Sequence, residues 1–131
     1  MPNSPAEQRH AWLRVSAEVL LALVLVAVGC THGVLFVEGG SMKPALVAGD
    51  LIMYRRVGVT SDRGDLVVFR HGGTLVVHRV AEVVGDGSIR TAGDANETLD
   101  VEPVEDDDVC GEVVAILPAG RMAVRLARSV H

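Results

Sequence analysis

The sequence has few aromatic residues, a single lysine and two cysteines. Aromatic residues make up 3% of its 131 residues although 49% are hydrophobic, so Val, Leu and Ala supply most of the apolar surface. Such a composition indicates one membrane segment and a β-rich domain with a small-residue core. The basic residues are scattered and the net charge is −5, which argues against a nucleic-acid-binding face of clustered Lys and Arg.

The two cysteines are expected to be free thiols. Cys30 lies in the longest apolar run and Cys110 lies far along the chain. A disulfide between them would join a membrane segment to an aqueous domain. Neither is accompanied by the Cys-x2-Cys or His-x3-His spacing of a structural zinc site, so the sequence predicts no such site.

The longest apolar run, residues 15–37, has the length of a membrane-spanning helix, which needs roughly 20 residues. Its centre, Val19–Cys30, contains no polar side chain. We predict one N-terminal transmembrane helix over 15–37, after a short, weakly ordered tail at residues 1–14. A cleaved signal peptide and a buried core helix are the alternatives. The apolar run continues past the small-residue site at 28–30, which favours the anchor.

The charges that flank this run are asymmetric. Arg9 and Arg14 precede it, and Glu38 is the first charge on its far side. The positive-inside rule then places the N-terminus in the cytoplasm and the following domain outside. The prediction is a single-pass protein of the cell membrane with an extracytoplasmic domain.

Residues 38–118 are predicted to form the β-rich domain. Short apolar runs alternate there with turn signals such as Gly72-Gly73 and Asp86-Gly87. This pattern predicts a mainly β fold, a small antiparallel β-sheet or barrel. The expected strands are 51–54, 66–69, 74–84, 88–91 and 109–117, with an acidic loop at 93–108.

Residues 119–131 are expected to form a C-terminal amphipathic tail. Arg121, Arg125 and Arg128 fall on one face of a helix over this stretch. Either the apolar face packs on the domain and the arginines face solvent, or the helix lies on anionic lipid.

The stretch Val37–Pro44 joins the apolar run to the β-rich domain. Gly39 and Gly40 precede Ser41 there, and glycine adopts backbone conformations that other residues avoid. Taken alone, the stretch is either a flexible linker or a turn that presents Ser41 as a nucleophile.

A serine nucleophile needs a nearby base, usually a lysine or a histidine. Lys43, the only lysine, is two residues from Ser41 in a proline-ended loop and is poorly placed to reach back to it. His78 lies inside a predicted strand and shares a face with Val76 and Val80. The alternative to a base is a hydrogen-bonded core histidine. The other histidines fall in the tail, the anchor, a turn and the last position: His10, His32, His71 and His131.

A third group, an acid, should orient the histidine and stabilise its charged form. The acidic loop offers Asp94, in a turn after Gly93, and Asp100, which follows Leu99. The run at 105–108 is expected to be solvated charge. Spacing alone does not choose between Asp94 and Asp100.

Five motifs occur in the order seen in type I signal peptidases. The set resembles the subgroup with histidine in place of the bacterial lysine, which includes endoplasmic-reticulum, archaeal and Gram-positive enzymes. The resemblance covers residues 39–117 and the preceding anchor. The motifs are Gly40-Ser41-Met42-Lys43-Pro44, Gly49-Asp50, Arg63-Gly64-Asp65-Leu66-Val67-Val68-Phe69, Val77-His78-Arg79-Val80 and Gly93-Asp94-Ala95-Asn96.

The resemblance implies a membrane-bound serine endopeptidase that removes signal peptides from exported preproteins, without a metal or cofactor. Ser41 matches the nucleophile and His78 the general base. Asp100 matches the third catalytic position, and Asp94 matches a supporting acid. The implied partners are preprotein signal peptides, membrane lipid and possible secretion-machinery proteins, with no nucleic acid.

The residues beside the nucleophile, Gly40 and Met42, are the expected substrate or oxyanion contacts. The sequence departs from the usual pattern at Gly39, Lys43 and Ala95. A small polar residue is often found at the position of Gly39, so a side-chain oxyanion donor is missing there.

Two other functions are compatible with parts of the sequence. A self-cleaving repressor-type peptidase of the same superfamily would use a lysine base and a DNA-binding domain, and neither is recognised in this sequence. A non-enzymatic, membrane-anchored β module would bind export substrates or partner proteins without cutting them.

Overall fold

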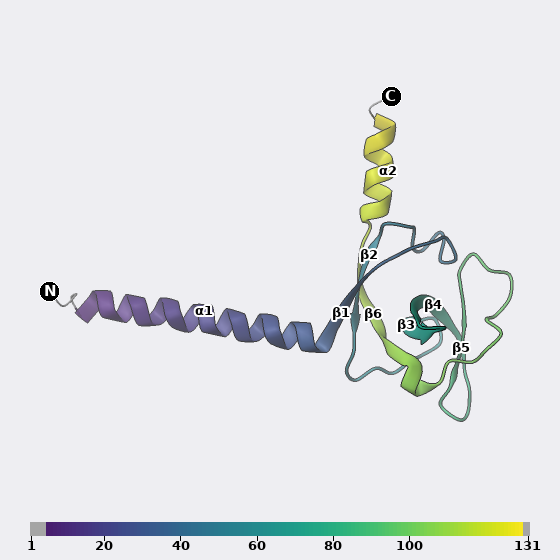
Figure 1. The fold of residues 1–131 in the computed structure, drawn as a ribbon, viewed down its shortest axis with the longest axis horizontal. Helices are drawn as coiled ribbons and strands as arrows, with labels where there is room; N and C mark the ends of the chain where they lie inside the picture. The colour runs from purple at the N-terminus through teal and green to yellow at the C-terminus, as the bar shows by residue number, and fades with distance from the viewer. Residues whose placement is uncertain (1–4, 130–131) are drawn as a thin grey trace. The chain divides into compact units, whose positions relative to one another are not determined.

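The computed structural model describes the backbone of residues 5–129 and the side chains of residues 16–123 and 125. The chain divides into two compact units, residues 1–31 and residues 32–131. The first unit holds helix α1, and the second holds the strands and helix α2. Figure 1 follows these elements along the chain.

Helix α1 spans Pro5–Thr31, so it begins within the stretch that we predicted to be a weakly ordered tail. Pro5 suits the first turn of a helix, and Ala6, Glu7 and Gln8 after it are compatible with helix. The Thr31 hydroxyl donates to the Ala27 carbonyl at 2.9 Å in the last turn. Residues 1–4 lie outside the described part of the chain.

Apolar side chains of α1 are exposed over the described half of the helix. Leu20, Leu23 and Leu25 are each more than half exposed. Among the residues that the structure describes, no helix is both long and apolar enough to cross a membrane. The transmembrane helix that we predicted at 15–37 is not confirmed.

The helix ends at Thr31, not at Val37 as predicted, because the next residues form a strand. Strand β1 (His32–Phe36) pairs antiparallel with β2 (Leu51–Arg55). Gly33 permits their close approach, since a Cβ at this position would collide with the ring of Tyr54. Strand pairing therefore overrides an apolar pattern that also suits a helix.

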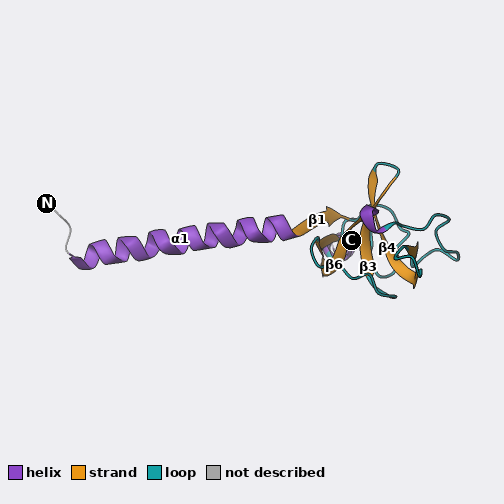
Figure 2. Cartoon of the chain, turned by 90° about the horizontal axis from the view of Figure 1, so that it is seen from below, coloured by secondary structure: helices purple, strands orange, loops and turns teal. Residues whose placement is uncertain are grey.

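The strands form one six-stranded antiparallel sheet in the order β1-β2-β6-β3-β4-β5, shown in orange in Figure 2. Strands β1 and β5 are its two edges, so the sheet is open and the barrel alternative is not found. The mainly β, antiparallel prediction is confirmed. The remaining strands are β3 (Leu66–His71), β4 (Thr74–Val83), β5 (Ile89–Ala92) and β6 (Val109–Leu117).

The hairpin between β3 and β4 turns at Gly72-Gly73, as predicted. Both glycines have positive φ, 56° and 81°, which two-residue hairpin turns of this kind require. The pairing of Val67 with His78 places the histidine in the middle of β4. After β5, the acidic loop returns to the sheet through a bridge between Ile89 and Val104 and a short 3-10 helix, η1 (Asp106–Asp108).

The loop after β1 is fastened into the core. Met42 is 2% exposed and Leu46 is 0% exposed, and both pack in a cluster with Ile52 and Val77. Burying such side chains contributes on the order of 2 kcal/mol each. The segment that carries Ser41 is therefore a fixed turn and not the flexible linker of the alternative prediction.

Helix α2 (Ala119–Ser129) lies within the stretch that we predicted to be a C-terminal amphipathic tail, and it contacts the same loop. Asp50, fully buried, accepts the Gly120 backbone N–H at 3.0 Å and the Val47 backbone N–H at 3.0 Å. The Arg121 side chain donates to the Ala45 carbonyl. The first turn of α2 is thus hydrogen-bonded to the C-terminal part of the Ser41 loop, residues 37–50.

Candidate active site

Ser41 and His78 lie within hydrogen-bond distance, with 3.1 Å between Ser41 Oγ and His78 Nε2. Ser41 occupies the turn after β1, and His78 lies in β4, so the fold joins residues far apart in the sequence. Lys43 is exposed, and its side chain lies beside Gly40. The described group that contacts the Ser41 hydroxyl is therefore the imidazole.

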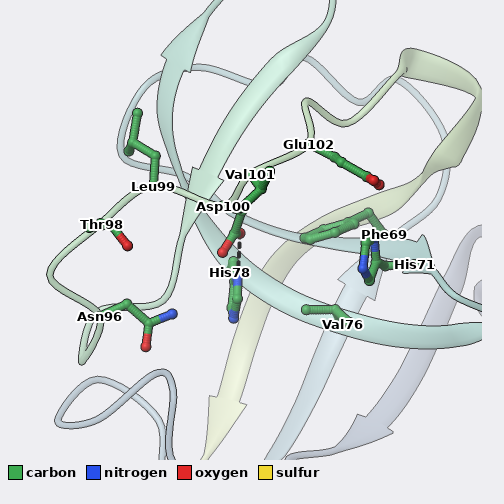
Figure 3. Close-up of a pocket in the computed structure, with 10 residues that line it drawn as sticks. All are labelled: Phe69, His71, Val76, His78, Asn96, Thr98, Leu99, Asp100, Val101 and Glu102. Atoms are coloured by element: carbon green, nitrogen blue, oxygen red, sulfur yellow. Dashed lines mark hydrogen bonds and ion pairs between the residues drawn. The ribbon is translucent and has the colours of Figure 1, made fainter.

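Asp100 approaches the other nitrogen of the imidazole. Its Oδ2 is 2.6 Å from His78 Nδ1, the contact that is dashed in Figure 3. A carboxylate only accepts, so Nδ1 donates and Nε2 of the neutral ring is left to accept the Ser41 proton. The side chains of His78 and Asp100 are 11% and 26% exposed. Partial shielding from water strengthens this hydrogen bond.

A buried threonine on β5 holds Asp100 in place. Thr91 Oγ1 donates to Asp100 Oδ2 at 2.7 Å, and the Asp100 backbone N–H donates to the Thr91 carbonyl at 2.8 Å. Thr91 is 0% exposed. Sequence reasoning missed this residue. The available signal was a polar side chain at a core-facing position of a strand, two residues after the apolar Ile89.

Asp94 contacts a different side chain from Asp100. Its two carboxylate oxygens accept from Arg79 Nε at 2.8 Å and from Arg79 Nη2 at 2.7 Å. A third guanidinium N–H donates to the Gly64 carbonyl at 2.7 Å. The hydrogen bonds that Arg79 donates to Asp94 raise the pKa of Arg79 above its ordinary value. Asp94 therefore ties its own loop to β4. It binds Arg79, the residue that follows His78, and not the histidine itself.

The turn at Gly93 joins the acidic loop to the Ser41 loop. The Ala95 backbone N–H donates to the Ser41 carbonyl at 2.8 Å. Gly93 is buried, and a Cβ at this position would lie 2.6 Å from the Ser41 carbonyl oxygen, so any larger residue would push the two loops apart. The two halves of the site are thus in direct backbone contact.

A groove of about 670 Å³ runs beside Ser41, between β1 and the start of β4. The two residues beside Ser41 that we predicted to contact substrate differ in their burial. Gly40 is half-buried, whereas the Met42 side chain is 2% exposed and packs into the core, although Met42 also lines the groove.

The other histidines whose side chains the structure describes occupy different places in the sheet. His71 is exposed at the end of β3, and His32 begins β1. The side chains of His10 and His131 lie outside the described residues. No group of three or more His, Cys, Asp or Glu side chains within the described part of the chain is arranged to hold a metal ion.

A hydroxyl, an imidazole and a carboxylate in this order have the geometry of a catalytic triad for acyl transfer. Comparison with known proteins points to peptidases. A family model described as Peptidase S24-like matches residues 6–114. Signal peptidase I W of Bacillus subtilis (strain 168) is 29% identical over 105 residues, which cover 70% of this chain and 55% of that protein.

Two further relatives are catalytic subunits of signal peptidase complexes. The signal peptidase complex catalytic subunit SEC11 of Pyricularia oryzae is 33% identical over 107 residues, 71% of this chain and 62% of that protein. The SEC11 subunit of Colletotrichum graminicola is 34% identical over 99 residues, 65% of this chain and 58% of that protein. The chain spans less than two thirds of the length of these curated relatives. The family model covers most of the chain, and the chain therefore belongs to a type I signal peptidase-like family of peptidases.

Proposed function

We propose that this chain is a membrane-anchored serine endopeptidase that cleaves signal peptides from exported preproteins. One observation carries the proposal: the hydrogen-bonded series of Ser41 Oγ, His78 and Asp100, with separations of 3.1 and 2.6 Å. The names of the relatives, signal peptidase I W and signal peptidase complex catalytic subunit SEC11, support the same reaction.

In the proposed reaction, His78 Nε2 accepts the proton of Ser41 Oγ while that oxygen attacks the scissile carbonyl carbon. Asp100 stabilises the imidazolium that forms. The imidazolium then gives its proton to the leaving amine, and the signal peptide stays attached to Ser41 as an ester. His78 next deprotonates a water molecule that hydrolyses this ester.

The negative charge that develops on the carbonyl oxygen needs preorganised donors. The backbone N–H of Ser41 is the proposed donor. Gly40 has no side chain to obstruct the substrate carbonyl, and the buried Met42 side chain anchors the turn in the core. Gly39 has a φ of 82° and lacks a side-chain donor. The proposed oxyanion site is therefore made of backbone groups.

The groove beside Ser41 suits an extended peptide that ends at the scissile bond. Strand β1 is an edge strand, and residues 74–77 of β4 pair only with β3, because the pairing with β5 begins at Arg79. Both therefore have free backbone groups for an added strand. Apolar residues such as Val34 and Val76 line the groove, consistent with the small, uncharged side chains expected before the cleavage site.

Asp94 is the proposed supporting acid, through Arg79. Its paired hydrogen bonds to Arg79, together with the Ala95–Ser41 backbone bond, hold the acidic loop against both β4 and the nucleophile. Asp100 is the proposed orienting acid because it contacts the imidazole directly.

The membrane assignment belongs to the proposal as well. The exposed apolar side chains of α1 suit a lipid environment, and Arg9 and Arg14 before them favour a cytoplasmic N-terminus. We propose a single-pass anchor, with the β domain on the extracytoplasmic side. Because the SEC11 relatives are named as subunits of a complex, secretion-machinery partners are proposed too.

The test is cleavage of a preprotein by the purified chain in lipid vesicles. We expect mass spectrometry to find a single cut at the end of the signal peptide with the wild-type chain and none with Ser41→Ala. Circular dichroism and the melting temperature should match between the two proteins, since Ser41 is half-buried in a turn. Binding of the preprotein without any cut by the wild-type chain would favour the non-enzymatic β module instead.

A further inference from the structure

A second pocket, of about 610 Å³, lies on the Asp100 side of His78 (Figure 3). It is separate from the groove beside Ser41, and the two share one lining residue, Val76. Ser41 lines the groove and His78 lines the pocket. The hydrogen-bonded pair of Ser41 and His78 thus stands between the two hollows.

The chemistry of the proposed reaction assigns one end of the substrate to each hollow, so the inference rests on that proposed function. The acyl side stays bonded to Ser41 and therefore remains in the groove. The leaving amine takes its proton from His78 Nε2 and must lie within hydrogen-bond distance of it. The chain that follows the scissile bond consequently leaves the site past His78, toward the second pocket.

Two exposed apolar side chains line this pocket on either side of Asp100. Leu99 is 41% exposed and Val101 is 90% exposed, while Asp100 between them points to the imidazole (Figure 3). Phe69 and Val76 also line the pocket and add apolar surface. Single exposed apolar residues are ordinary, but several gathered around one hollow mark a binding site.

We infer that this pocket binds an apolar side chain from the first three residues after the scissile bond, with Leu99 and Val101 as specificity-determining residues. Three extended residues span about 10 Å, which sets the reach from His78. Glu102 at the pocket and the acidic run 105–108 after it disfavour a negatively charged residue there. The expected order of preference is Leu, then Ser, then Asp.

The experiment uses peptides with one signal-peptide sequence and Leu, Ser or Asp at the first, second or third position after the cut. The full chain is assayed in phosphatidylcholine vesicles, and kcat/KM is measured for each peptide. For the wild-type chain we expect Leu to exceed Ser by about fivefold or more at one of the three positions, the size of effect of an open apolar pocket.

The variants Leu99→Ser and Val101→Ser are expected to bring the Leu/Ser ratio at that position close to one. The ratio is measured within each variant, so a general loss of activity cancels. Val57→Ser is the matched control: Val57 is exposed like Leu99 and lines neither hollow. It should keep the wild-type ratio.

Equal kcat/KM for Leu and Ser at all three positions in the wild-type chain would overturn the inference while the proposed function stands. A ratio that survives in both Leu99→Ser and Val101→Ser would also overturn it. If no peptide is cut at all, the proposed function fails, and the inference fails with it.

Discussion

The two loops that meet in the site are held in opposite ways. The Ser41 loop, residues 37–50, is fixed by buried groups: Leu46 and Asp50 are both 0% exposed. The acidic loop, residues 93–108, is fixed largely by hydrogen bonds and by the partly exposed ion pair of Arg79 and Asp94, whose side chains are 38% and 17% exposed. The position of the nucleophile therefore depends on folding of the whole domain, whereas the position of the acid depends on a few polar contacts.

Because of this difference, substitutions in the two loops should affect stability and activity separately. Substitutions on the acidic-loop side should change the cleavage rate and leave the free energy of unfolding nearly unchanged. Substitutions at the base of the Ser41 loop should lower the free energy of unfolding first. The four predictions below test this separation, in order of decreasing effect.

The largest effect is expected for His78→Ala. Without the imidazole, no group described near Ser41 Oγ accepts its proton, so kcat should fall by at least about 10³-fold. Cleavage of a preprotein in vesicles measures kcat, and thermal unfolding should show a melting temperature close to that of the wild type. A variant that cuts at more than a tenth of the wild-type rate would remove His78 from the mechanism.

The next effect distinguishes the two carboxylates. Asp100→Asn should lower kcat by about 10²- to 10⁴-fold, because the amide no longer holds the Nδ1–H tautomer of His78. Asp94→Asn should lower kcat by about tenfold or less, because it only weakens the contact with Arg79. Single-turnover kinetics of both variants measure the difference. A larger loss for Asp94→Asn would reverse the assignment.

Asp50→Asn should affect stability more than any exposed carboxylate does. In the variant, an amide nitrogen replaces one of the two buried oxygens that accept from the Gly120 and Val47 N–H groups. Losing one of these hydrogen bonds should lower the free energy of unfolding by about 2 kcal/mol. Urea denaturation measures this loss. Asp65→Asn is the matched control, since Asp65 also accepts a backbone N–H three residues earlier, from Asp62, but at an exposed site. Equal losses would show that burial of Asp50 does not matter.

The smallest effect is expected for Thr91→Val, which keeps the shape but removes the hydroxyl that donates to Asp100. We expect kcat to fall by about tenfold with little change in KM, because Thr91 acts through Asp100 and touches no substrate. Thr91→Ser should recover most of the rate. If Thr91→Ser is as slow as Thr91→Val, restoring the hydroxyl does not restore the rate, and the hydrogen bond to Asp100 alone does not explain the effect.

Much of the fold could be predicted from the sequence because its signals are local. The hairpin at Gly72-Gly73 and the strands over 51–54 and 109–117 follow from alternation and turn chemistry, and the structure has them. Strand β1 could not be predicted from the same signals. Its residues Val34–Phe36 continue the apolar run of the helix, and only the pairing with β2 and the fit of Gly33 over Tyr54 make them a strand.

The candidate site divides in the same way. Ser41 stood out because it follows Gly39-Gly40, and His78 stood out by elimination of the one lysine and the four other histidines. Spacing could not decide between Asp94 and Asp100, because the loop between them folds back on itself. The roles of Thr91 and Arg79 were missed. Thr91 binds Asp100 and Arg79 binds Asp94, and these contacts depend on the fold and not on neighbours in the sequence.

The central claim is that Ser41 and His78 act as one catalytic unit. The most direct test compares the cleavage rates of Ser41→Ala, His78→Ala and the double variant on one preprotein in vesicles. We expect nearly the same residual rate for all three variants, because losing either partner already disables the other. A double variant whose loss equals the product of the two single losses would show that the residues act independently, and would contradict the account.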